Sequence, residues 1–82
     1  MKAYILVQTR YGESNKVITE CHNNHGKFFI QGKPVYGWYD AIVELEIPNT
    51  NKLREITEEL KKSQPDITQI GTMVERTDNV TV

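Results

Sequence analysis

Several features are scarce in this 82-residue sequence, which has a single cysteine, three prolines and five glycines. One cysteine excludes a disulfide framework within the chain and is typical of a reducing compartment. No apolar run approaches the roughly 20 residues that a membrane-spanning helix needs, and the start of the chain lacks the pattern of a signal peptide. We therefore expect a cytoplasmic protein that does not engage a membrane.

An excess of positive charge is also missing. Ten basic residues balance eleven acidic ones, the formal net charge is -1, and Lys61-Lys62 is the only adjacent basic pair. Nucleic-acid binding depends on clustered Lys and Arg, so we expect no direct contact with DNA. A chain of this length forms one small domain near the lower limit for independent folding, and it gains stability by self-association.

The spacing of apolar residues predicts the order β-α-β-β-α-β. A helix capped by Glu13 or Ser14 carries apolar residues at helical spacing, and a second helix is capped by Asn49 or Thr50. A run of alternating apolar and polar residues predicts a half-buried strand at 40–47. The other predicted strands span 3–9, 28–36 and 67–76, the first helix ends near residue 25, and the second ends before a turn at 64–66.

The segment Gly32-Lys33-Pro34 is expected to interrupt the second strand before Val35 and Tyr36 resume it. Proline cannot donate a hydrogen bond to a sheet ladder, so this strand should lie at an edge or carry a bulge.

Right-handed crossovers place these elements in a ferredoxin-like α+β fold, an antiparallel sheet with both helices on one face. The other face stays open and is expected to carry apolar side chains, which favours dimerisation through the open sheet face. These residues are Tyr4, Leu6, Ile42, Ile67 and Met73. The predicted domain spans residues 1–76, and 77–82 form a polar tail, expected to be mobile unless a neighbouring subunit pairs with it.

The segment Gly37-Trp38-Tyr39-Asp40 precedes the alternating strand and is the candidate ligand site. A glycine permits backbone angles that other residues resist and leaves amide groups open to a ligand. Asp40, three residues later, can hold a cationic group beside those amides. The open amides and the carboxylate together suit a small zwitterion. The alternative is that Gly and Asp serve only the conformation of a turn.

The element order, the Gly37-x-Tyr39-Asp40 motif and Pro65 ahead of a last strand with Thr72 give the chain a resemblance to a known family. From about Lys2 to Arg76 it resembles the effector-binding domain of the Lrp/AsnC (feast/famine) transcriptional regulators, in a version without their helix-turn-helix.

The resemblance implies a homodimer that assembles further, into rings such as octamers, and that binds amino acid effectors at contacts between dimers. Gly37, Trp38 and Tyr39 would form the ligand-facing turn, and Asp40 would accept from the amino group of the ligand. Thr72 would come from a neighbouring subunit. No cofactor is implied. The resemblance also suggests full-length Lrp/AsnC regulators as partners.

Cys21, His22 and His25 lie at helical spacing that could bring metal ligands together. Cys21 also continues an apolar stripe, and a histidine near a helix end suits the helix dipole, so we expect no metal site.

No catalytic triad, close carboxylate pair or phosphate-binding loop is apparent, so we expect no enzymatic activity. Two alternatives are an adaptor that co-assembles with full-length regulators without binding a ligand, and a dimeric ferredoxin-like barrel enzyme.

Overall fold

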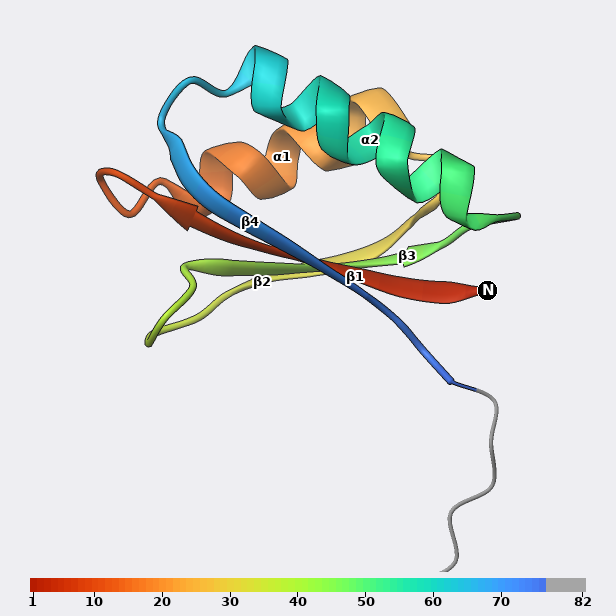
Figure 1. The fold of residues 1–82 in the computed structure, drawn as a ribbon. Coiled ribbons are helices and arrows are strands. Elements are labelled where there is room, and N and C mark those ends of the chain that lie inside the picture. Colours follow the sequence, from red (N-terminus) through yellow and green to blue (C-terminus); the bar gives the residue numbers. More distant parts are fainter. Residues whose placement is uncertain (77–82) are drawn as a thin grey trace, which may run out of the picture.

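Two helices lie against one face of a four-stranded sheet in the computed structural model, which describes residues 1–76 (Figure 1). The elements follow the predicted order and are β1 (Lys2–Thr9), α1 (Ser14–His25), β2 (Phe29–Pro34), β3 (Ala41–Glu46), α2 (Thr50–Ser63) and β4 (Ile67–Val74). Of the helices within residues 1–76, none combines the length and the apolar character that crossing a lipid bilayer requires.

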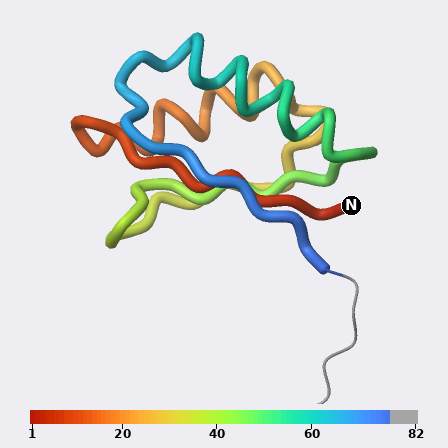
Figure 2. Tube along the Cα trace, viewed as in Figure 1, coloured from red at the N-terminus to blue at the C-terminus, as the bar shows by residue number. Residues whose placement is uncertain are grey.

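The strands pair antiparallel in the order β2-β3-β1-β4, and the chain trace shows β1 between β3 and β4 (Figure 2). Both helices cover the same face, so the predicted ferredoxin-like α+β fold is confirmed (Figure 1). The edges of the sheet are β2 and β4, which agrees with the edge position expected for the strand that contains Pro34.

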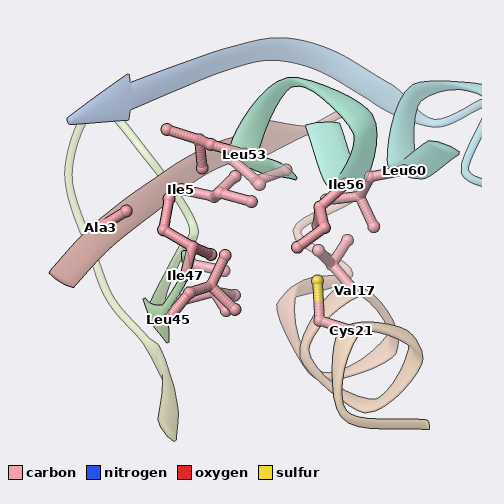
Figure 3. Packing of buried hydrophobic residues seen from close by; sticks show 12 residues of the cluster. Ala3, Ile5, Val17, Cys21, Leu45, Ile47, Leu53, Ile56 and Leu60 are labelled. Carbon is pink, nitrogen blue, oxygen red and sulfur yellow. The ribbon is translucent and has the colours of Figure 1, made fainter. Parts of the chain in front are cut away.

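The hydrophobic core fills the space between the sheet and the helices (Figure 3). Alternate residues of the strands point into it, because side chains in a strand alternate between the two faces. Burying one such aliphatic side chain contributes about 1.5–3 kcal/mol. The buried strand residues are Ala3, Ile5, Val7, Ala41, Val43 and Leu45, and the helices and the residue after β3 add Val17, Cys21, Leu53, Ile56, Leu60 and Ile47.

The two helices begin differently. Of the two predicted caps of α2, the structure selects Asn49, whose side-chain oxygen Oδ1 accepts a hydrogen bond from the amide of Lys52 at 2.9 Å. Glu13 holds the cap position of α1, but its side chain makes no capping hydrogen bond. Its own amide instead donates to Oγ1 of Thr9 at 2.7 Å, which fastens the start of α1 to the end of β1.

The predicted interruption of the second strand is wrong. β2 runs without a break through Gly32 to Pro34, and Val35 and Tyr36 lie beyond its end. The strand does carry a bulge, but it lies between Phe29 and Gln31, where the register shifts, and not at Pro34, which pairs regularly with Ala41. Packing explains the glycine: a Cβ atom at Gly32 would lie 2.5 Å from Cγ2 of Ile18 on α1.

One residue assigned to the open sheet face belongs to the core. Ile67 packs against the buried cluster, because a register shift between Gln8 and Thr9 pairs it with the buried Thr9. The other four assignments hold: Tyr4 pairs with Met73 and Leu6 with Ile42, on the face opposite the helices. The predicted tail, 77–82, lies outside the described residues.

Replacing Gly32 with alanine is expected to lower the free energy of unfolding by about 1–3 kcal/mol, since the added methyl group overpacks a filled site. Urea unfolding followed by circular dichroism measures this loss. The double variant with Ile18→Ala should lose less free energy of unfolding than the two single variants lose in sum, because the shortened side chain makes room for the added methyl group. Strict additivity would show that Ile18 does not set the requirement for glycine.

Candidate functional site

The turn between β2 and β3 carries most of the predicted site. Gly37 has φ +127°, a region that L side chains rarely adopt. A Cβ atom there would meet nothing within 4 Å, so the backbone angle alone accounts for the glycine. The neighbouring side chains face solvent: Tyr36 is fully exposed and Trp38 is 75% exposed.

Asp40 ties this turn to β1. Its Oδ2 atom accepts hydrogen bonds from the amide of Thr9 at 2.7 Å and from Thr9 Oγ1 at 3.0 Å. The same Thr9 hydroxyl oxygen accepts from the amide of Glu13, so one carboxylate connects the β2–β3 turn, the end of β1 and the start of α1. Oδ2 is committed to this junction, which leaves Oδ1 as the atom suited to a bound cation.

A pocket of about 310 Å³ opens beside Asp40, between the β1–α1 loop and the β2–β3 turn. This volume is at the lower end for small-molecule sites. Ser14, the first residue of α1, lines it together with Asp40, so an anion-attracting helix start and a carboxylate share one cavity. The remaining lining residues are Gly12, Pro34, Val35 and Tyr36.

The structure therefore brings only Asp40 of the five predicted site residues into this pocket. Gly12, Ser14, Pro34 and Val35 were missed, because two loops far apart in the sequence meet here only after folding. The signal that could have found one of them is Gly12, whose φ of +64° marks a turn directly before a helix start.

Tyr39 lies on the other side of the sheet. A Cβ atom at Gly71 would be 3.3 Å from the hydroxyl of Tyr39, so this ring reaches over the open face as far as β4. The backbone of Trp38 also contacts this face, since its carbonyl accepts a hydrogen bond from Nε2 of Gln8 at 3.0 Å. Thr68 in turn donates to Oε1 of Gln8 at 3.0 Å. The turn thus presents Asp40 to the pocket and Tyr39 to the open face.

Thr72 is separate from this region within one chain. It pairs with the buried Ile5, so its side chain lies on the helix-covered face, where it lines a groove with α2. Its contribution to a site on a neighbouring subunit stays a prediction.

The three residues weighed as metal ligands have three different surroundings. The Cys21 thiol is buried in the core (Figure 3). His22 packs edge-to-face on Phe29, with ring centroids 5.1 Å apart, and His25 Nε2 lies 3.0 Å from a carboxylate oxygen of Glu59. Within residues 1–76, no group of three or more His, Cys, Asp or Glu side chains is arranged to hold a metal ion.

No family model matches the sequence, and no curated protein matches it either. Solved structures do. The hypothetical protein PHS023 from Pyrococcus horikoshii has a TM-score of 0.75 and 26% identity, over 94% of this chain and 90% of that one. FFRP-DM1, a feast/famine regulatory protein, has a TM-score of 0.75 and 27% identity, over 92% and 97%. TTHA0845 from Thermus thermophilus shares the fold, with a TM-score of 0.79 and 12% identity over 98% of both chains.

Burial raises the pKa of the Cys21 thiol to about 12, and the charge of Glu20 acts in the same direction. The unfolded chain releases this proton near pH 9 while the folded chain keeps it, so stability should fall as the pH rises from 9 toward 12. The expected slope reaches about 1.4 kcal/mol per pH unit.

Denaturant unfolding at several pH values measures this slope, and Cys21→Ala should be less stable at neutral pH but lack the cysteine contribution above pH 9. An identical pH slope in both proteins would contradict the assignment.

Proposed function

We propose that this chain is a small-molecule-binding and oligomerisation module of the feast/famine (Lrp/AsnC) type, which modulates transcriptional regulation and carries out no catalysis. The likeness to FFRP-DM1, which spans 97% of that chain at 27% identity, carries the proposal. The pocket beside Asp40 and the uncovered sheet face give it a physical basis.

The chemistry of the pocket suits an amino acid. Asp40 Oδ1 offers a partner for an ammonium group, and the amides in the first turn of α1 suit a carboxylate. Pro34, Val35 and Tyr36 supply apolar wall, which favours an apolar or aromatic side chain over a charged one.

The open sheet face supplies the surface for dimerisation. Tyr4, Leu6, Ile42 and Met73 form a contiguous apolar patch across three strands, and Met73 is 51% exposed in the single chain. Lys2 and Glu44 lie 3.9 Å apart at its rim. A second sheet packed on this face would bury the patch and stabilise a small domain.

Binding and assembly are coupled through the β2–β3 turn. Asp40 holds one end of this turn, while Tyr36 and Trp38 project from it toward solvent, where a neighbouring dimer would contact them. A ligand that fixes the turn shifts the assembly equilibrium by its difference in affinity for the two states.

The adaptor function remains the second candidate, and one observation favours it. Half of the Asp40 carboxylate is already used by Thr9, so the residue has a structural reason to be acidic without any ligand. An adaptor would use the same dimer surface and respond to no amino acid.

Thermal-shift measurements against the proteinogenic amino acids separate the two candidates, because a ligand bound only by the folded state raises the melting temperature. We expect at least one amino acid at millimolar concentration to do so. Asp40→Asn should weaken its binding by tenfold or more, since the amide oxygen still accepts from Thr9 while the charge is lost.

Two further variants complete this test. Asp66→Asn removes the same charge outside the pocket lining and should bind normally. Asp40→Ala should in addition lose about 1–3 kcal/mol of stability, because it leaves the Thr9 amide without its acceptor. No shift with any amino acid would favour the adaptor, and normal binding by Asp40→Asn would refute the site.

Leu6→Lys places a charge in the centre of the open face and is expected to lower the molar mass in solution by a factor of two, measured by light scattering after gel filtration. Thr19→Lys adds the same charge on the exposed side of α1 and should leave the mass unchanged. An unchanged mass for a folded Leu6→Lys protein would show that the open face is not the dimer surface.

A further inference from the structure

The two edges of the sheet differ in how they are protected. β2 carries the devices that keep edge strands from pairing, namely a bulge after Phe29, Lys33 and Pro34. β4 carries neither a charged residue nor a proline over its eight residues, Ile67–Val74. A long, uncharged edge strand is a ready template for another strand, so this contrast points to a partner at β4.

The hydrogen bonds show which backbone groups of β4 are left at the edge. The amide of Glu75 donates to the carbonyl of Lys2 at 2.8 Å, which makes these two residues a hydrogen-bonded pair with β1. Such pairs alternate along an antiparallel ladder. The amides and carbonyls of Ile70, Thr72 and Val74 therefore point away from β1, toward the open edge.

We propose that β4 pairs with β4 of a second copy of this chain, antiparallel, about a two-fold axis at Thr72. In this register Thr72 faces Thr72, and Ile70 faces Val74 in both directions, so all six outward-pointing residues of the two strands exchange backbone hydrogen bonds. Thr–Thr pairs and pairs of β-branched residues are favourable across strands.

The other residues fit the same register. Gly71 falls opposite Met73, so the Met73 side chain of one copy lies beside the Tyr39 ring that covers this glycine in the other. Gln69 falls opposite Glu75, and no two like charges face each other between Gln69 and Glu75. The strand is therefore complementary to itself, which a two-fold interface requires.

A groove beside this edge provides additional apolar surface for the second strand. It has a volume of about 320 Å³ and lies between α2 and β4, with Leu53 and Val74 in its lining. Val74 is 36% exposed in the single chain. On the helix-covered face, Ile70 of the second copy would pack against Val74 and cover part of this groove. The result is a continuous eight-stranded sheet, built independently of the face-to-face contact and of any ligand.

Cysteine cross-linking tests the register. Opposed residues of a hydrogen-bonded pair have Cα atoms about 5.5 Å apart, within the range for a disulfide. Thr72→Cys should therefore form a disulfide-linked dimer under mild oxidation of the ligand-free protein. Gln69→Cys is the matched control: the two copies of residue 69 would lie roughly 20 Å apart, six strand residues at about 3.4 Å each, and should not cross-link. Cys21 is buried and should not interfere.

Gel filtration with light scattering gives an independent measure. Thr72→Pro removes an edge amide without touching the ladder to β1, and should weaken association through β4 at least tenfold, whereas Thr72→Val keeps the amide and should associate like the native chain.

Cross-linking of Thr72→Cys but not Gln69→Cys supports the proposal. Equal cross-linking of both variants, or no cross-linking of Thr72→Cys, overturns it. Equal association of the Pro and Val variants also overturns it. The Leu6→Lys result is separate, because that variant changes a side chain on the open face, whereas the proposed contact uses the outward-pointing backbone groups of β4.

Discussion

The central position of β1 is the constraint on which the rest of this structure depends. Its odd-numbered residues pair through backbone hydrogen bonds with β3 and its even-numbered residues with β4, so neither neighbour can shift without breaking a ladder. The same alternation sends Ala3, Ile5 and Val7 into the core and leaves Tyr4 and Leu6 on the uncovered face. One strand thus determines both the core and the surface available for assembly.

The end of β1 also organises the candidate site. Thr9 is buried, and its amide and hydroxyl both donate to Asp40, while its hydroxyl oxygen accepts from the amide of Glu13. Buried polar groups need hydrogen-bond partners for the chain to fold. The contacts among Asp40, Thr9 and Glu13 meet this need without any ligand. They place Asp40 beside the start of α1 as a consequence, and the proposed ligand pocket uses that placement.

The two proposals use three surfaces of residues 1–76, and each has a different character. The open face is apolar, the β2–β3 turn displays Tyr36 and Trp38, and the β4 edge offers backbone groups. The β4 edge lies apart from the turn, whereas Tyr39 brings the turn to the margin of the open face. The proposed function draws on the first two, and the edge pairing adds a contact whose specificity comes from register.

The sequence by itself determined the order of the elements, the ferredoxin-like fold, the start of α2 at Asn49 or Thr50 and most of the core, because these follow from local periodicity and capping chemistry. The tertiary structure alone decided three matters: that β2 continues through Gly32, that Ile67 is buried, and that Asp40 shares its pocket with Gly12 and Ser14 rather than with Tyr39. Each depends on contacts between distant segments, namely Ile18 against Gly32, a bulge opposite Thr9, and the meeting of two loops. Periodicity carries no information about such contacts.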